Sequence, residues 1–258
     1  MNTTNTDIKV TNLSIKFQKN SKSKSFFALD SVNFEVKRGE FFCIVGPSGC
    51  GKSTLLKTLL GFLQPTTGEV YISEERKKAG MVYLPQSPSL LPWRTLLQNA
   101  ALGLEIKGKL DKDRKDILKF EIDKFGLGDF EKHLSTEISG GMKQKVELIR
   151  ALASGPQLLF CDEPFASIDF VNRFELNTEF KYRCTIAKTT TVFVTHNIEE
   201  AIFLGNKIAV MSQRPGQIMK IYEPKLSKNA QDAVKCRESP EFEDLFQEIW
   251  ENLKGNYE

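Results

Sequence analysis

A glycine-rich segment at residues 46–53 constrains the fold of this 258-residue chain more than any other feature. Its sequence, Gly46-Pro47-Ser48-Gly49-Cys50-Gly51-Lys52-Ser53, fits the pattern G-x-x-x-x-G-K-[ST]. Residues 41–45, just before it, are continuously apolar, which is typical of a strand buried on both faces. Residues 52–63, after it, carry apolar side chains at helical spacing. The segment therefore predicts a strand, a tight loop and a helix in succession.

The residue types in this loop suit the binding of phosphate groups. Glycines let backbone N–H groups turn towards phosphate oxygens, and the first turn of the following helix adds a partial positive charge. Lys52 is long enough to reach the β and γ phosphates, and the hydroxyl of Ser53 suits Mg²⁺. The alternative is a glycine-rich turn with a surface lysine, which does not account for the strand and helix on either side.

Two carboxylates follow another short apolar run, at residues 158–161. Asp162 and Glu163 are therefore expected at the end of a buried strand, beside the phosphate loop. A carboxylate in that place suits Mg²⁺, and a second one suits the activation of water, so we assign Asp162 to the metal and Glu163 as the general base. Taken alone, the same pattern also fits a solvated strand end.

Residues 138–145, Ile-Ser-Gly-Gly-Met-Lys-Gln-Lys, precede the carboxylates and open a helical pattern. Ser139 suits a helix N-cap, and Gly140 and Gly141 would let a ligand approach the N–H groups of the first turn. This predicts a second anion site, which a single nucleotide bound to one chain does not need. By itself the segment also fits an ordinary loop, but together with the first two motifs it points to one family.

The three motifs together resemble those of the nucleotide-binding subunit of ABC transporters, over about residues 8–250. Residues 46–53 resemble the Walker A motif of that family, residues 158–163 its Walker B motif and residues 138–144 its signature motif. The resemblance implies ATP and Mg²⁺ as cofactors and adds further positions to the site. These are Thr54 beside the phosphates, Gln86 of the Q-loop, Asp169 of the D-loop and His196 as the switch histidine.

The resemblance also implies a role for each position. ATP would be bound by Gly46, Pro47, Ser48, Gly49, Cys50, Gly51, Lys52, Ser53 and Thr54. The catalytic residues would be Glu163, His196, Lys52 and Gln86. The metal would be held by Ser53, Gln86 and Asp162. The ATP of a partner subunit would be contacted by Ser139, Gly140, Gly141, Met142 and Gln144. Phe17 would stack on adenine, with Phe26 and Phe27 as alternatives. Three of these residues also have a simpler structural interpretation: Phe17 as part of a strand core, Gln86 as a loop residue and His196 as a structural histidine.

The expected fold is α/β, the ABC ATPase fold: a P-loop NTPase core with a mostly parallel sheet, an N-terminal antiparallel β subdomain and an all-helical insert. Residues 8–17 and 32–36 alternate in polarity, which predicts antiparallel strands joined by a solvated, lysine-rich loop within residues 16–24. Residues 191–194, 207–211 and 217–222 predict further strands, and residues 241–253 predict a closing helix. We expect a single domain, residues 1–258, with its ATP-binding core at about 1–93 and 156–222, a helical subdomain at about 94–155 and a C-terminal helical tail at about 223–258.

Composition narrows the remaining possibilities. The chain is 40% hydrophobic and 27% charged, which indicates a globular protein, and its net charge of +3 is too small to favour nucleic acid as a partner. Its five cysteines are widely spaced and form no CxxC pair, so neither a disulfide framework nor a zinc site is expected. No apolar run approaches the roughly 20 residues of a membrane span, which predicts a chain that does not itself cross a bilayer.

Residues 89–93, 99–104 and 214–216 resemble a narrower group, the nitrate, sulfonate and taurine importers. The resemblance implies a Mg-dependent ATPase on the cytoplasmic face of the membrane. Its partners would be a second copy or a homologous ATPase subunit, transmembrane permease subunits and, indirectly, a solute-binding protein. The sequence departs mildly from the family pattern at Ile138, Lys143, Lys145, Ala166 and Ser167. The alternatives are a soluble ABC-type ATPase acting on nucleic acid or ribosomes, and a P-loop kinase or GTPase, which leaves residues 138–145 without a role.

Overall fold

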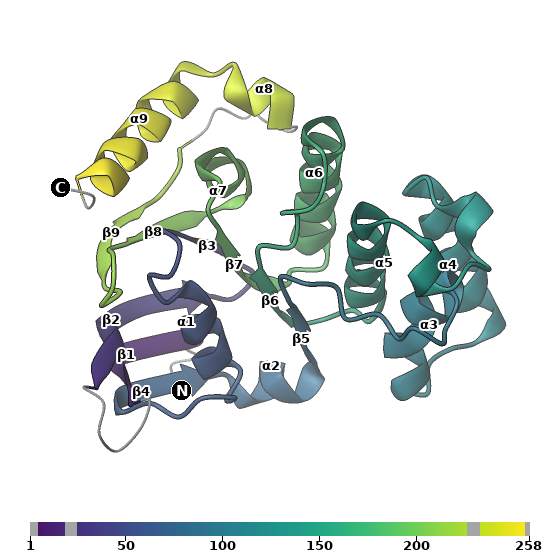
Figure 1. Cartoon of the computed structure of the whole chain (residues 1–258), viewed down its shortest axis with the longest axis horizontal. Helices are drawn as coiled ribbons and strands as arrows, with labels where there is room; N and C mark the ends of the chain where they lie inside the picture. The colour runs from purple at the N-terminus through teal and green to yellow at the C-terminus, as the bar shows by residue number, and fades with distance from the viewer. Residues whose placement is uncertain (1–4, 19–24, 226–232, 256–258) are drawn as a thin grey trace.

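The computed structural model describes residues 5–18, 25–225 and 233–255, so most of the expected lysine-rich loop and part of the C-terminal tail lie outside it (Figure 1). The strands are β1 (Thr6–Phe17), β2 (Phe26–Lys37), β3 (Phe41–Val45), β4 (Thr67–Ile72), β5 (Met81–Leu84), β6 (Leu158–Asp162), β7 (Thr190–Thr195), β8 (Lys207–Met211) and β9 (Ile218–Tyr222). The α-helices are α1 (Lys52–Leu59), α2 (Glu74–Ala79), α3 (Leu96–Ile106), α4 (Lys112–Lys124), α5 (Gly140–Ala153), α6 (Phe170–Ile186), α7 (Ile198–Leu204), α8 (Ala233–Arg237) and α9 (Pro240–Lys254).

The strands form two sheets. The larger has the order β5-β6-β7-β3-β8-β9, and every neighbouring pair in it is parallel except β8 and β9. The smaller sheet is antiparallel and has the order β2-β1-β4. This arrangement confirms the expected α/β class, with a mostly parallel core and an N-terminal antiparallel subdomain.

Both faces of the larger sheet are buried, as β3 illustrates. Phe41 and Cys43 belong to one hydrophobic cluster, which also contains side chains of α3, α5, α6 and α7. Phe42 and Ile44 belong to the other, which α1 and the antiparallel sheet complete. There the ring of Phe42 stacks on that of Phe34, with centroids 4.9 Å apart. Because successive strand residues face opposite sides, a strand covered on both faces must be apolar throughout.

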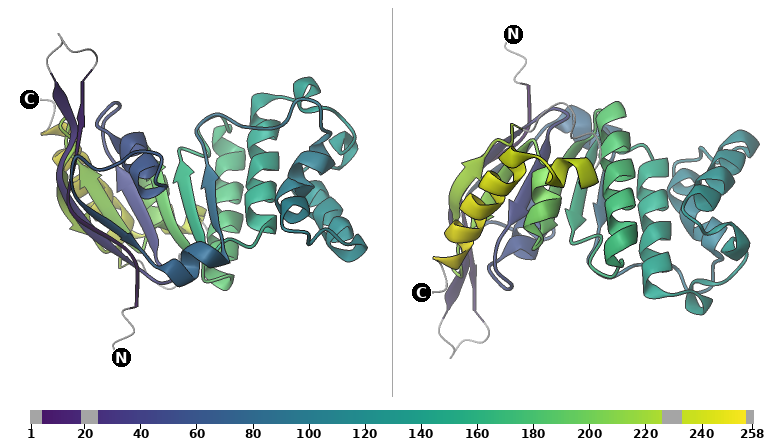
Figure 2. Two further views of the ribbon diagram at one scale, coloured as in Figure 1. Left: turned by 90° about the horizontal axis from the view of Figure 1, so that it is seen from below. Right: turned by 90° about the horizontal axis from the view of Figure 1, so that it is seen from above.

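Helices α3, α4 and α5, with two short 3₁₀ turns (Gly128–Phe130 and Ser135–Glu137), form the expected all-helical insert. Figure 2 shows α3 and α4 at the end of the molecule farthest from the antiparallel sheet. The start of α3 is fixed by a capping box, in which the Gln98 N–H donates to Thr95 Oγ1 and the Thr95 N–H donates to Gln98 Oε1. Within the described ranges, no helix is both long and apolar enough to cross a membrane.

The sequence does not predict three elements between residues 67 and 84, namely β4, α2 and β5. Strand β4 lies at the edge of the small sheet and is mostly exposed, so it lacks an alternating apolar face, and α2 and β5 are very short. The expected helix over residues 52–63 is also too long, because α1 ends at Leu59. Gly61, with φ 78°, lets the Phe62 N–H donate to the Lys57 carbonyl at 2.9 Å, which closes the helix.

Asn99 joins the segment after Gln86 to helix α3. Its side chain is fully buried, and its Oδ1 accepts a hydrogen bond from the Leu91 N–H at 2.8 Å. Its Nδ2 donates to the carbonyls of Leu91, Arg94 and Thr95, each at 3.1 Å. Asn99, in the motif at residues 99–104, therefore fixes the backbone of the motif at residues 89–93.

Replacing Asn99 with alanine is expected to lower the free energy of unfolding by about 2–4 kcal/mol, because it leaves a cavity and removes the acceptor of the Leu91 N–H. Urea unfolding followed by circular dichroism measures the loss. Gln98→Ala, at the exposed neighbouring position, is the control and should cost only about 1 kcal/mol, since it removes half of a capping box. A loss for Asn99→Ala no larger than that of the control would contradict this role.

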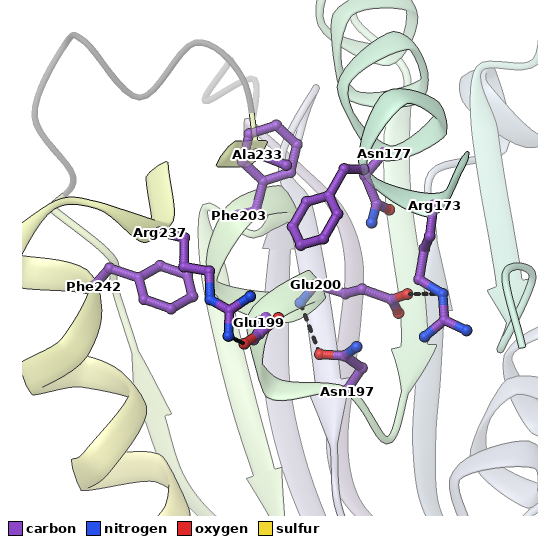
Figure 3. Close-up of a pocket in the computed structure, with 10 residues that line it drawn as sticks. Arg173, Asn177, Asn197, Glu199, Glu200, Phe203, Ala233, Arg237 and Phe242 are labelled. Carbon is purple, nitrogen blue, oxygen red and sulfur yellow. Dashed lines mark hydrogen bonds and ion pairs between the residues drawn. The ribbon is translucent and has the colours of Figure 1, made fainter. Parts of the chain in front are cut away.

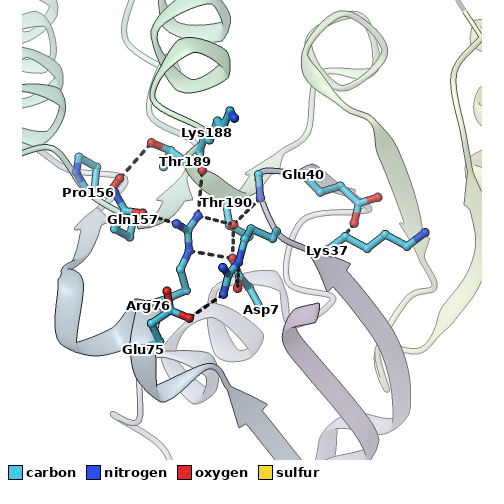
Figure 4. Close-up of polar contacts among 12 residues, drawn as sticks. Asp7, Lys37, Glu40, Glu75, Arg76, Pro156, Gln157, Lys188, Thr189 and Thr190 are labelled. Carbon is cyan, nitrogen blue, oxygen red and sulfur yellow. Dashed lines mark hydrogen bonds and ion pairs between the residues drawn. The ribbon is translucent and has the colours of Figure 1, made fainter. Parts of the chain in front are cut away.

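A second buried polar network joins the start of β1 to α2 and to the amino ends of β6 and β7 (Figure 4). Asp7 is fully buried and accepts hydrogen bonds from Arg76 Nε at 2.9 Å and from Thr190 Oγ1 at 2.5 Å. The guanidinium of Arg76 also donates to the side chain of Gln157 and, at 2.8 Å, to the carbonyl of Lys188. The network therefore connects the antiparallel sheet to the core sheet.

Candidate functional site

The candidate site residues gather where the central parallel strands end. The phosphate loop follows β3, Asp162 ends β6 with Glu163 directly after it, and His196 follows β7. Strands β6, β7 and β3 are neighbours in the sheet. Carboxyl ends of parallel strands lie at the same edge of a sheet, and ligands of open α/β sheets bind there. The sheet order thus brings together three segments that are far apart in the sequence.

Lys52 is the first residue of α1, and its side chain lies over the phosphate loop. It is 6% exposed, and its ammonium group donates to the carbonyls of Gly46 at 2.8 Å and Pro47 at 2.9 Å. Ser48 and Gly49, at the tip of the loop, are exposed. The loop therefore presents a helix N-terminus and a nearby cation, which together suit a phosphate group.

Asp162 and Ser53 fit the expected metal site. Burial raises the pKa of Asp162, and a hydrogen bond from the hydroxyl of Ser53 opposes that shift. A hydroxyl and a carboxylate are oxygen ligands of the kind that Mg²⁺ takes together with phosphate oxygens. Among the described residues, no cluster of three His, Cys, Asp or Glu side chains offers another metal site. The donor set therefore fits Mg²⁺ bound jointly with a nucleotide.

Tyr83 on β5 is a neighbour of Asp162 that the sequence motifs do not mark. Burial and the negative charge of Asp162 raise the pKa of Tyr83 to about 12. A hydrogen bond between the phenol and the carboxylate of Asp162 contributes to the same shift. Tyr83 belongs to a strand of only four residues, and nothing in the neighbouring sequence predicts its contact with Asp162.

The side chains of Glu163 and His196 meet at the sheet edge. Glu163 Oε2 lies 2.8 Å from His196 Nδ1, and the side chains are 17% and 58% exposed respectively. Glu163 has φ 48°, an uncommon backbone conformation for a residue other than glycine, and its N–H donates to the Val194 carbonyl at 2.9 Å. A carboxylate held in this way by an imidazole can orient a water molecule and accept its proton.

The signature segment lies apart from the phosphate loop of its own chain. Ser139 caps α5, as predicted, by accepting a hydrogen bond from the Met142 N–H at 3.3 Å, and Ser139 and Gly140 are both exposed. Gln144 Oε1 accepts from the Ser167 N–H at 3.2 Å, which joins α5 to the segment just before Asp169. Helix α5 packs in one hydrophobic cluster and α1 in the other. The starts of α5 and α1 thus belong to helices that pack on opposite faces of the larger sheet.

The structure places the remaining candidates as follows. Asp169 caps α6 by accepting from the Asn172 N–H at 3.1 Å, and its hydrogen bonds to Asn172 lower its pKa. Gln86 is exposed, just beyond the end of β5. Phe17 is partly buried against the cluster that contains α1, and its ring centroid lies 6.0 Å from that of Phe26. Phe26 and Phe27, the two alternatives to Phe17, begin strand β2 and are 37% and 40% exposed.

Arg173 on α6 contacts Glu200 on α7, and no local sequence pattern reveals this pairing (Figure 3). Its Nη2 donates to the carbonyl of Ile168 at 2.8 Å, and its Nε lies 3.7 Å from Glu200 Oε1. The other carboxylate oxygen of Glu200 accepts from Thr195 Oγ1 at 2.7 Å, directly before His196. Burial raises the pKa of Glu200. These contacts hold the segments that carry Asp169 and His196 in a fixed relation.

Comparison with known proteins shows the family of the chain. The family model described as ABC transporter matches residues 29–166. The chain is 41% identical to the aliphatic sulfonates import ATP-binding protein SsuB of Bacillus cereus, over 81% of this chain and 85% of that protein. It is 40% identical to an uncharacterized ABC transporter ATP-binding protein of Methanocaldococcus jannaschii, over 83% of this chain and 80% of that protein.

Solved structures show the same fold. The chain matches the dimeric structure of MJ0796, a bacterial ABC transporter cassette, with a TM-score of 0.73 and 29% identity, over 84% of this chain and 99% of that chain. A dimeric structure of the same cassette bound to ADP and Pi matches with a TM-score of 0.72 and 27% identity, over the same shares of both chains. The sequence family and the fold agree, and the chain belongs to the ABC transporter family as one of its ATP-binding subunits.

Proposed function

We propose that the chain hydrolyses ATP to energise the import of a small anionic or zwitterionic solute of the nitrate, sulfonate or taurine type. The observation that carries the proposal is the contact of Glu163 with His196, at 2.8 Å, on the sheet edge that also bears the phosphate loop. The solute class is supported by relatives named for aliphatic sulfonates import and by the motifs at residues 89–93, 99–104 and 214–216.

Phosphoryl transfer depends on positioning and on charge neutralisation more than on covalent chemistry. Lys52 and the N–H groups of the first turn of α1 would bind the β and γ phosphates. Ser53 and Asp162, with Gln86, would hold Mg²⁺, which neutralises phosphate charge when bound. Glu163 would take the proton of the attacking water, and His196 would hold the carboxylate in place.

A complete ATP site would need two chains. Ser139 and Gly140 are exposed at the start of α5, on a helix that does not belong to the hydrophobic cluster around α1. The N–H groups of that helix start, with Gly141, Met142 and Gln144, would therefore bind the γ phosphate of a nucleotide held by a second copy or by a homologous ATPase subunit. The likeness to a cassette whose structure is dimeric supports this arrangement.

A membrane permease would dock on the segment after Gln86 and on the helical insert, with this chain peripheral on the cytoplasmic face. Three large apolar side chains are exposed there: Trp93 is 71% exposed, Ile106 77% and Phe120 67%. Exposed apolar surface of this kind is available to a protein partner. A solute-binding protein would then act through the permease, without touching this chain.

Purification of the chain from its own cells in a mild detergent, with mass spectrometry of the co-purifying proteins, tests this function. A multi-span permease is the expected partner, and Trp93→Ala should reduce its recovery without changing ATP hydrolysis by the isolated chain. Recovery of ribosomes, nucleic acid or only soluble proteins would overturn the importer assignment. The permease and its binding protein would narrow the solute for uptake assays.

A further inference from the structure

The turn between β8 and β9 packs directly against the phosphate loop. Gly216 lies so close to the loop that a Cβ atom on it would come within 2.2 Å of the Cys50 carbonyl oxygen. Its N–H donates to the Ala28 carbonyl at 2.9 Å, and its carbonyl accepts from the Asp30 N–H at 3.1 Å. Only glycine fits this position without displacing the backbone of the phosphate loop, so residues 214–216 are anchored between that loop and β2.

Arg214, in the same turn, contacts both ends of the candidate ATP site. Its Nη2 donates to the Gly49 carbonyl in the phosphate loop at 3.1 Å. The central carbon of its guanidinium lies 5.0 Å from the ring centroid of Phe26, within the range of a cation–π contact. Phe26 in turn pairs with Phe17 across β1 and β2. The guanidinium therefore bridges the phosphate loop and the aromatic pair considered for adenine.

The positive charge of Arg214 is available to a ligand. In the part of the chain that the structure describes, no carboxylate lies within ion-pair distance of this guanidinium, whereas most other described arginines have such a partner. The hydrogen bond to the Gly49 carbonyl uses one of its five N–H donors, the contact with the ring of Phe26 uses none, and neither partner carries a negative charge. A phosphate would compensate that charge better than either contact does.

We propose that Arg214 contacts the bound nucleotide at its α phosphate. This inference rests on the proposed ATP site: with the β and γ phosphates in the loop and the base at Phe17 or Phe26, the ribose and the α phosphate must lie between them. Arg214 spans that interval. The α phosphate takes no part in the reaction, so the contact stabilises the bound substrate and the transition state equally.

Arg214→Gln should therefore weaken the binding of ADP and raise the KM for ATP, each by about tenfold, with kcat unchanged. Arg214→Lys, which keeps the charge but loses the planar donor group, should lie between the parent and Arg214→Gln. The difference between the parent and Arg214→Gln should shrink as salt is raised, because the contact is partly exposed. Isothermal titration calorimetry with ADP and steady-state phosphate release measure these effects on the purified chain.

Arg114→Gln, a substitution of an exposed arginine on α4, is the matched control and should change neither constant. An unchanged ADP affinity in Arg214→Gln would overturn the inference. So would a fall in kcat as large as the rise in KM together with a lower melting temperature of the nucleotide-free protein, since that result indicates a purely structural role. A parent protein that failed to bind ADP would instead contradict the proposed ATP site itself, and this inference with it.

Discussion

Replacing Glu163 with glutamine is expected to lower the rate of ATP hydrolysis by at least about a hundredfold while leaving the affinity for ATP close to that of the parent. Loss of a positioned general base costs about 10²–10⁴ in rate. Glutamine has nearly the same shape, so the contact with His196 can persist as a hydrogen bond, but an amide cannot accept the proton of water. The residues around the phosphate loop are not touched by the change.

Phosphate release at saturating ATP and calorimetric titration with ATP separate the two effects. Glu175→Gln is the control, because it makes the same chemical change at an exposed position on α6 and should retain the parent rate. His196→Ala should also slow hydrolysis, since it removes the group that holds the Glu163 carboxylate at 2.8 Å. If Glu163→Gln hydrolysed ATP at the parent rate, the assignment of the base would be wrong.

Features that depend on neighbouring residues could be predicted from the sequence. Phosphate binding requires glycines, Lys52 and Ser53 in one short loop, and a strand buried on both faces, such as β3, must be continuously apolar. Ser139 could be predicted as a cap because its role involves only the first turn of α5. The roles of these residues towards ATP stay predictions, but their placement follows from local chemistry.

Contacts between distant parts of the chain could not be predicted in this way. Arg173 and Glu200 lie on different helices, and each resembles an ordinary charged residue of a solvated helix face until the fold brings them together. Strand β4 gave no signal because an exposed edge strand needs no apolar face. The motif at residues 214–216 was visible as a resemblance, yet its closeness to the phosphate loop depends on the sheet order that makes β3 and β8 neighbours.

Replacing Arg76 with methionine is expected to lower the free energy of unfolding by about 3–5 kcal/mol. The change leaves the carboxylate of Asp7, which is fully buried, without its nearest cation, and an uncompensated buried charge is costly. Arg38 also approaches Asp7, but at 3.4 Å and with its side chain 41% exposed, so it replaces little of the lost interaction. Urea unfolding of the purified chain measures the loss.

Two further variants separate the buried charge from the general effect of changing α2. Lys77→Met removes an exposed cation from the same helix, one whose partner Glu74 is also exposed, and should cost less than about 1 kcal/mol. The double variant Asp7→Leu with Arg76→Met removes both charges, so it should recover much of the stability lost by Arg76→Met alone. A double variant as unstable as the sum of its two single changes would contradict this account.

The position of this network also predicts what Arg76→Met should leave unchanged. Gln157 and Thr190 lie at the amino ends of β6 and β7, whereas Asp162, Glu163 and His196 lie at or beyond the carboxyl ends of the same strands. A loss of stability at one end of two rigid strands does not alter the groups at the other end while the protein remains folded. Well below its melting temperature, Arg76→Met should therefore bind ADP with the parent affinity. A weaker affinity in the folded variant would show that the network also positions the phosphate loop.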